Sequence, residues 1–101
     1  MMMLLTDDRV LEVFESPQSP PSWIEAIDIE NGEYRFCDDK GQRYVGISTK
    51  RTGWLGTGKF ELRRAGRPDL KNALELVDAA VSIKPNSVFP DLASVRQHLQ
   101  A

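Results

Sequence analysis

An Asn-Gly pair between two stretches of alternating polarity constrains the fold of this chain more than any other feature. Residues 23–30 and 33–38 flank Asn31-Gly32, the dipeptide favoured in a two-residue type I′ hairpin turn. Such a turn fixes the register of the two strands. That register puts apolar residues together on one face and opposite charges on the other: Ile29 with Tyr34, Ile27 with Phe36, and Asp28 with Arg35. The pattern therefore predicts a β-hairpin.

The residues before the hairpin predict a helix and an extended connection. Thr6 can cap a helix over residues 7–15 by accepting a backbone N–H, and the apolar residues of this segment recur at helical spacing (Val10, Leu11 and Phe14). Three prolines between residues 16 and 22 then favour an extended connection, because proline fixes φ and lacks a donor.

Two further strands are expected after the hairpin. Gly41, in the turn Asp38–Gly41, can adopt the left-handed conformation of a bulge and lead into a strand over residues 42–48. Whether Tyr44, or Val45 with Ile47, faces the core depends on that bulge. The glycine-punctuated residues 50–57 predict a loop, and residues 58–64 a fourth strand.

The last third of the chain predicts two helices. Pro68 suits a first helical position, and an apolar stripe continues to about Ile83. A last short helix starts near Pro90 or Asp91. The expected fold is thus α+β: a four-stranded antiparallel meander with an N-terminal helix and two C-terminal helices packed on one face. Residues 1–101 are expected to form a single globular domain.

The composition indicates an intracellular protein. Cys37 is the single cysteine, so no intrachain disulfide can form, and small secreted domains usually carry several. No apolar run approaches the roughly 20 residues of a membrane span, and the N-terminus lacks the basic start and longer apolar stretch of a signal peptide. We expect a cytoplasmic protein that does not contact a membrane.

Several motifs resemble active sites only superficially. Gly53–Lys59 fits the first seven positions of a phosphate-binding loop, but Phe60 stands where a magnesium-binding hydroxyl is needed. Cys37 and His98 are too few for a zinc site within one chain, and a lone histidine near a helix C-terminus suits the helix dipole. The carboxylate pairs Asp7/Asp8 and Asp38/Asp39 fit a helix start and a turn. We expect no catalytic residues, no cofactor and no metal.

The surface signal lies in residues 50–71, which hold seven basic and two acidic side chains in a chain of net charge −2. Trp54 and Leu55 lie in the expected loop, flanked by Lys50, Arg51 and Lys59, and tryptophan and arginine are enriched among residues that dominate binding energy. The competing interpretation is that Trp54 folds back onto the core.

Three functional hypotheses follow. The first is a non-catalytic protein-interaction module, such as a small accessory, inhibitor or immunity-type protein, which binds a protein partner or itself through the 50–59 loop. The second is a nucleic-acid-associated protein using the basic segment 50–71, which predicts a continuous positive face; the pI of about 5.3 argues against it. The third is a small carboxylate-based enzyme, which requires a deep pocket with perturbed acids.

Overall fold

A computed structural model gives the structure of the chain and describes residues 1–21, 24, 32, 34–50 and 59–101. The described elements are two helices and six strands that form one mixed sheet. In chain order they are β1 (Met2–Leu5), β2 (Val10–Phe14), β3 (Arg35–Asp38), β4 (Arg43–Lys50), β5 (Lys59–Ala65), α2 (Leu70–Ala79), β6 (Ser82–Ile83) and α3 (Leu92–Gln100).

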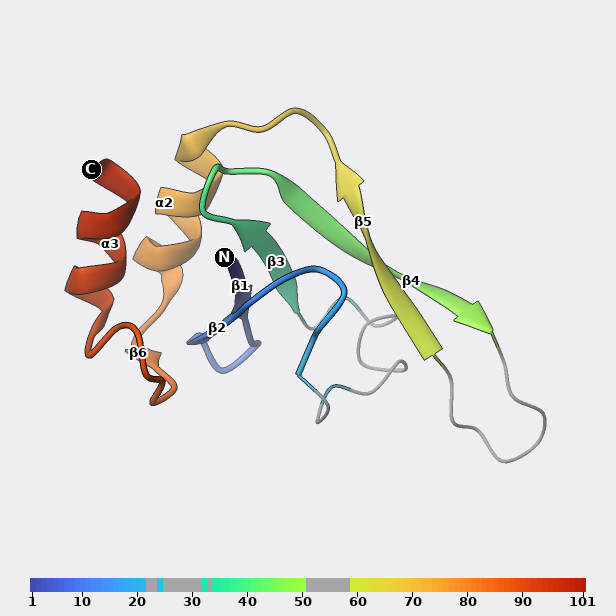
Figure 1. Ribbon diagram of the computed structural model, residues 1–101, viewed down its shortest axis with the longest axis horizontal. Coiled ribbons are helices and arrows are strands. Elements are labelled where there is room, and N and C mark those ends of the chain that lie inside the picture. Colours follow the sequence, from blue (N-terminus) through green and yellow to red (C-terminus); the bar gives the residue numbers. More distant parts are fainter. Residues whose placement is uncertain (22–23, 25–31, 33, 51–58) are drawn as a thin grey trace.

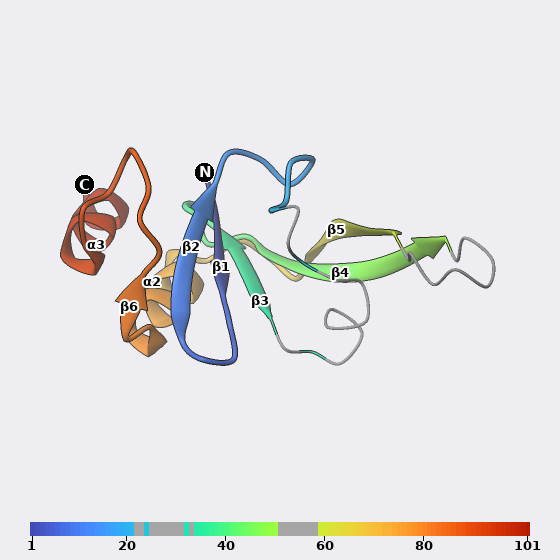
Figure 2. The ribbon, with the colours of Figure 1, turned by 90° about the horizontal axis from the view of Figure 1, so that it is seen from below.

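The sheet is built around β1. Its strand order is β5-β4-β3-β1-β2-β6, and every neighbouring pair is antiparallel except β2 and β6. The two helices lie together at one end, and the β4–β5 ladder projects away from them at the other (Figure 1 and Figure 2). One end of the sheet is therefore covered by helices, and the other extends as an arm.

Side chains of β1 are buried on both faces of the sheet. Met3 and Leu5 belong to a cluster with α2, α3 and Phe89, whereas Met2 and Leu4 join Ile24 and Phe36 on the opposite face. Successive side chains of a strand point to opposite faces, so an unbroken apolar run suits a strand with a core on each side. We call the two sides the helix face and the second face.

The predicted N-terminal helix over residues 7–15 is wrong, and the four-stranded meander is wrong with it. Residues 2–14 form the antiparallel hairpin β1–β2, in which Leu5 pairs with Leu11. The Thr6 hydroxyl does accept a backbone N–H, from Val10 at 3.1 Å, but it does so in the hairpin turn. The spacing of Val10, Leu11 and Phe14 is compatible with a strand as well as with a helix. The strand is adopted because it lets the apolar residues 2–5 be buried on both faces of the sheet.

The predicted pairing of Ile27 with Phe36 is also wrong. Both neighbours of Phe36 in the sheet are taken, by Leu4 of β1 and by Tyr44 of β4. Ile27, Asp28, Ile29 and Asn31 lie outside the described residues. Gly32 has the positive φ (70°) that its expected turn position requires.

The strands β4 and β5 are confirmed with small shifts in their ends. Gly41 adopts the predicted left-handed conformation, with φ 86°, although the register irregularity lies at the other end of β4, between Ser48 and Lys50. Tyr44 packs with the second-face cluster. Val45 therefore points to the helix face, and it lies beyond the helices with 47% of its surface exposed.

Both predicted C-terminal helices are confirmed, but the first is shorter than expected. It begins at Leu70 because the Asp69 side chain caps it, accepting the N–H of Lys71. It ends at Ala79 rather than near Ile83, which instead pairs in β6 with Leu11 of β2. The helix α3 begins after Asp91, which forms a reciprocal capping box with Ser94.

The turn between β3 and β4 contacts the start of α2 directly. The Gly41 carbonyl accepts hydrogen bonds from the Asp69 N–H at 3.2 Å and from Asn72 Nδ2 at 3.1 Å. A Cβ atom added at Gly41 would lie 1.9 Å from the Asp69 carbonyl oxygen. Only glycine allows this approach, so the turn fixes the position of the helix relative to the sheet.

Substituting Gly41 by alanine should therefore destabilise the fold more than its backbone conformation alone explains. Gly66 is a matched control, because its φ is 71° and nothing lies within 4 Å of an added Cβ. We expect Gly66→Ala to lower the free energy of unfolding by about 1–2 kcal/mol, the cost of a left-handed L-residue. Gly41→Ala should cost about 3 kcal/mol or more, because the overlap with Asp69 adds to that strain. Equal losses in denaturant unfolding would contradict the close contact.

Candidate binding surfaces

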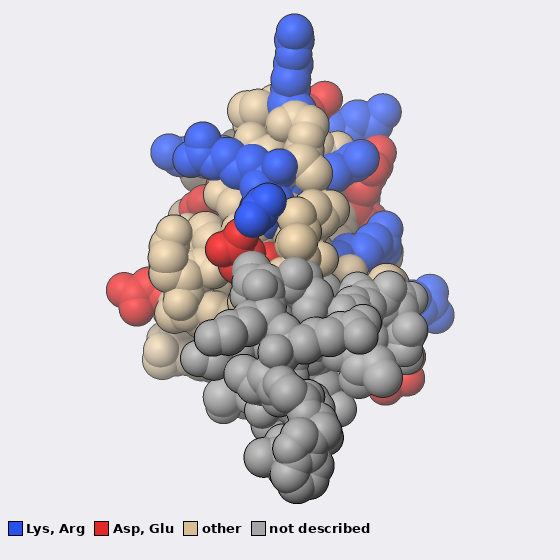
Figure 3. Space-filling view, turned by 90° about the vertical axis from the view of Figure 1, so that its right-hand side faces the viewer, with Lys and Arg blue, Asp and Glu red and all other residues tan. Residues whose placement is uncertain are grey.

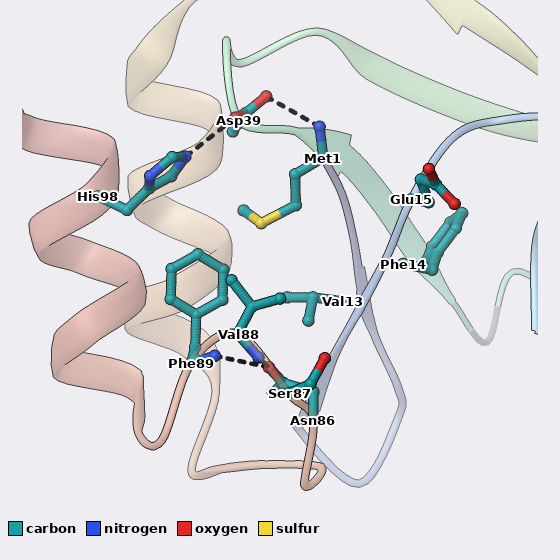
Figure 4. A pocket seen from close by; sticks show the side chains of 10 residues that line it. All are labelled: Met1, Val13, Phe14, Glu15, Asp39, Asn86, Ser87, Val88, Phe89 and His98. Atoms are coloured by element: carbon teal, nitrogen blue, oxygen red, sulfur yellow. Dashed lines mark hydrogen bonds and ion pairs between the residues drawn. The ribbon is translucent and has the colours of Figure 1, made fainter.

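One candidate site is a pocket of about 610 Å³ beside α3. Figure 4 shows its lining: the Met1, Phe89 and His98 side chains on one side, Phe14 and Glu15 on the other, and the 86–89 loop below. Its walls are mainly apolar, and Asp39 lies at one end, with His98 and the Met1 ammonium beside it. We call it the Asp39 pocket.

Asp39 joins three parts of the chain at this pocket. Its carboxylate accepts a hydrogen bond from His98 Nε2 at 3.0 Å and one from the Met1 ammonium at 3.4 Å. Burial of the carboxyl acts to raise its pKa, but the His98 hydrogen bond and the Met1 ammonium outweigh that effect and hold the pKa below the ordinary 3.8. Asp39 thus remains an anion that ties α3 to the turn after β3.

The other polar groups of the Asp39 pocket also stabilise the fold. Asn86 Oδ1 accepts the backbone N–H groups of Val88 and Phe89 and so shapes the loop before α3. The Phe89 ring packs edge-on against His98 with 5.4 Å between ring centroids. No buried side-chain nitrogen or oxygen in the described part of the chain lacks a hydrogen-bond partner. The pocket therefore presents no buried polar group left over to orient a ligand.

A second cavity, of about 500 Å³, lies on the helix face where the cover of α2 ends. Its floor and walls include Cys37, Val45, Ala65 and Leu76, and its charged lining is Arg35, Arg43 and Glu75. We call it the arginine groove.

The sheet register explains how the arginines come together in this groove. Phe36 pairs with Tyr44, and Val45 pairs with Arg63, so Arg35, Val45 and Arg63 form one row across three strands on the helix face. In the next row Arg43 lies between Cys37 and Ala65. Arg43 Nη2 also donates to Asn72 Oδ1 of α2 at 2.9 Å, which orients this guanidinium at the edge of the helix.

Cys37 at the base of the groove is a buried thiol. Burial, with a smaller contribution from the Asp38 carboxylate, raises its pKa to about 11, against an opposing effect of Arg43. The thiolate is the nucleophilic form of cysteine, so Cys37 is protonated and unreactive at neutral pH and serves as a small apolar core residue.

In the view from the end of the arm, the described cations do not form an unbroken positive surface (Figure 3). Seen from the end of the arm, Lys and Arg side chains spread over the described surface with Asp and Glu side chains among them (Figure 3). Arg63, for example, pairs with Glu61 at 2.5 Å. This view does not show the continuous positive face that the nucleic-acid hypothesis predicts.

The structure describes two of the five residues predicted to bind a partner, Lys50 and Lys59. Lys50 and Lys59 are opposite one another at the ends of β4 and β5, whereas Arg51, Trp54 and Leu55 lie outside the described residues. The segment after Gly58 is the strand β5, as expected, and not the helix that a phosphate-binding loop requires.

The remaining predicted chemistry has structural explanations. His98 lies in the last turn of α3, where the dipole argument placed it, and its ring pairs with the Asp39 carboxylate. Asp38 does form a turn, because its Oδ1 accepts the N–H groups of Lys40 and Gln42. Within the described ranges no group of three or more His, Cys, Asp and Glu side chains could hold a metal ion.

Sequence reasoning missed both the Asp39–His98 pair and the arginine groove. Asp39 and His98 are 59 residues apart, and no local pattern links them. Arg35 and Arg43 join one surface only through the pairing of β3 with β4. One feature of the sequence could have indicated the groove. Side chains alternate between the two faces along the strand over residues 42–48, so Arg43 and Val45 share a face once Tyr44 lies on the other.

Comparison of the chain with protein-family models, with curated proteins and with solved structures finds no match. Neither of the described helices is long and apolar enough to cross a membrane. The candidate sites are thus defined by their own geometry.

The Asp39 carboxylate should stabilise the fold in a pH-dependent way. Because its pKa is lowered from 3.8 in the folded chain, this stabilisation is complete above pH 3.8 and is lost as the pH falls through the folded-state value. We expect Asp39→Asn to lower the unfolding free energy by about 1 kcal/mol at neutral pH, with the difference from wild type shrinking in denaturant titrations below pH 3.8.

Asp78→Asn is the control for this variant. Asp78 forms an exposed ion pair with Arg96 of α3, and such pairs contribute about 0–1 kcal/mol. If the deficit of Asp39→Asn were no larger than that of Asp78→Asn, or persisted undiminished at pH 2 to 3, the carboxylate would not be the link between α3 and the turn.

Proposed function

We propose that the chain is a non-catalytic protein-interaction module that binds an acidic, partly apolar segment of a partner protein in the arginine groove. The observation that carries the proposal is the row Arg35–Val45–Arg63 on the part of the helix face that the helices leave uncovered. Val45 in its centre is 47% exposed. Arginine is enriched among residues that dominate binding energy, and the exposed Val45 side chain beside it offers apolar surface for a partner to cover.

The charge of the groove supports an acidic occupant. Among the described residues, no carboxylate forms an ion pair with Arg35 or Arg43. Arg43 is held by Asn72 at 2.9 Å, so its guanidinium loses less conformational entropy when it binds a carboxylate. An acidic side chain can pair with these arginines while a neighbouring apolar side chain covers Val45.

The non-catalytic assignment is supported by the state of the titratable groups. The Asp39 pKa is lowered, whereas a general acid at neutral pH needs a raised one. The Cys37 thiol has a pKa raised to about 11, which opposes nucleophilic chemistry. Asp39 and Cys37 are therefore better explained as residues that stabilise the fold than as catalytic residues.

The arm offers the partner a second contact region beyond the groove. β4 ends at Lys50 and β5 starts at Lys59, and Arg51, Trp54 and Leu55 lie between these two strands in the sequence. We propose that these residues extend the same interface. We also propose a cytoplasmic location, in keeping with a single cysteine that is buried.

Charge reversal in the groove tests the proposal. A fluorescently labelled peptide of alternating glutamate and valine residues should bind the wild-type chain at physiological salt, as measured by anisotropy. The variant Arg35→Glu/Arg43→Glu should bind it at least about tenfold more weakly, or about 1.4 kcal/mol, because two attractive contacts become repulsive. A peptide with lysine in place of glutamate should not bind the wild-type chain.

Arg64→Glu/Arg67→Glu is the matched control, since it makes the same change in charge outside the groove. Arg64 lies on β5 in register with Tyr44 of the second face, and Arg67 lies in the connection to α2. If this variant lost as much peptide affinity as the groove variant, net charge and not the groove would be responsible. Tighter binding of a single-stranded DNA, with a steep salt dependence, would instead favour the nucleic-acid hypothesis.

Trp54 gives an independent prediction for the end of the arm. If Trp54 contacts the partner, Trp54→Ala should leave the melting temperature nearly unchanged and weaken binding of the Glu-Val peptide by about 2 kcal/mol. If Trp54 instead packs on the core, the same variant should lose about 3–5 kcal/mol of stability. A thermal melt of this variant, with the binding measured in parallel, separates the two.

A further inference from the structure

Among the described strands, β5 is an edge of the sheet. The strand order ends with β5, and β4 is its partner on one side. The buried Gln42 side chain donates from Nε2 to the Ala65 and Gly66 carbonyls at 3.3 and 3.1 Å, which fixes the C-terminal end of β5. A fixed edge strand presents backbone N–H and C=O groups to any further strand that comes alongside.

We infer that two copies of this chain associate through antiparallel pairing of their β5 strands about a two-fold axis at Leu62. This inference is independent of the function proposed for the arginine groove. A two-fold axis normal to the sheet brings the same strand of both copies together and keeps the helix faces on one side. Strand addition of this kind supplies its affinity mainly through main-chain hydrogen bonds.

The charges of β5 select this register. With Leu62 opposite Leu62 of the second copy, Glu61 lies opposite the second copy's Arg63, and Arg63 lies opposite its Glu61. Directly opposed residues have Cβ atoms roughly 5 Å apart, so both pairs attract. Moving the axis to Glu61 or to Arg63 would instead place two like charges directly opposite one another, which is destabilising.

The second face is also compatible with this pairing. The same register places Phe60 of one copy opposite Arg64 of the other, and a guanidinium beside an aromatic ring is attracted by its face. Phe60 and Leu62 already pack at the margin of the second-face cluster, so the paired strands would extend an apolar surface across both copies.

The isolated chain already shows that these two charged side chains can pair. Glu61 Oε1 accepts hydrogen bonds from Arg63 Nε at 2.6 Å and from Nη2 within the same strand. Both side chains are about half exposed, at 48% and 60%. Exchange of these partners between two copies needs only side-chain rotation, because the carboxylate and the guanidinium lie on the same face of β5.

Charge exchange between Glu61 and Arg63 tests this pairing, with sedimentation velocity over a concentration series as the readout. The wild-type chain should show a reversible dimer. Glu61→Arg and Arg63→Glu should each raise the dimer dissociation constant by at least about tenfold, because each opposes like charges at both pairs. An equimolar mixture of these two variants should form a heterodimer, and the double variant Glu61→Arg/Arg63→Glu should form a homodimer again.

Each outcome of this experiment decides for or against the pairing. A wild-type chain that stays monomeric up to its solubility limit overturns it. So does a dimer that both single variants retain, or single variants that fail to dimerise when mixed. Circular dichroism melts of all variants show whether they fold, and recovery in the mixture excludes misfolding as the cause of the loss. Arg35→Glu/Arg43→Glu should dimerise like wild type, which separates this surface from the arginine groove.

Discussion

Burial of β1 on both sides is the constraint on which the rest of the structure depends. Met3 and Leu5 need a cover on the helix face, whereas Met2 and Leu4 need one on the second face. β1 also needs a hydrogen-bonded strand on each side, and β2 and β3 supply these. A single four-residue strand therefore requires apolar clusters on both faces of the sheet.

This arrangement also explains why the helices lie at one end of the sheet. The helix-face cluster contains residues of β1, β2 and β3 together with α2 and α3, and the contact of Gly41 with Asp69 places the start of α2 beside the β3–β4 turn. The outer strands β4 and β5 then extend beyond the helices, and their helix-face side chains remain available at the surface. The arginine groove is a consequence of the short helices as much as of the arginines.

Sequence patterns within a few neighbouring residues correctly predicted those helices, strands and turns that depend on contacts between neighbours. Asp91 with Ser94 and the left-handed Gly41 are properties of a few neighbouring residues, and the C-terminal helices and the strands β4 and β5 were predictable. The N-terminal hairpin was not, because the spacing of Val10, Leu11 and Phe14 suits a helix as well as a strand, and the choice depends on β3 more than twenty residues later. The two cavities share this property, since Asp39 meets His98 and Arg35 meets Val45 only through tertiary contacts.

The central position of β1 has a consequence for the chain as it leaves the ribosome. The hairpin β1–β2 can form early, but the residues that cover its helix face, such as Val77 and Val95, follow some seventy to ninety residues later. At a synthesis rate of about 5–20 residues per second, the apolar helix face stays uncovered for on the order of ten seconds. Until α2 and α3 have been synthesised, Met3 and Leu5 therefore belong to the kind of exposed apolar surface that promotes aggregation.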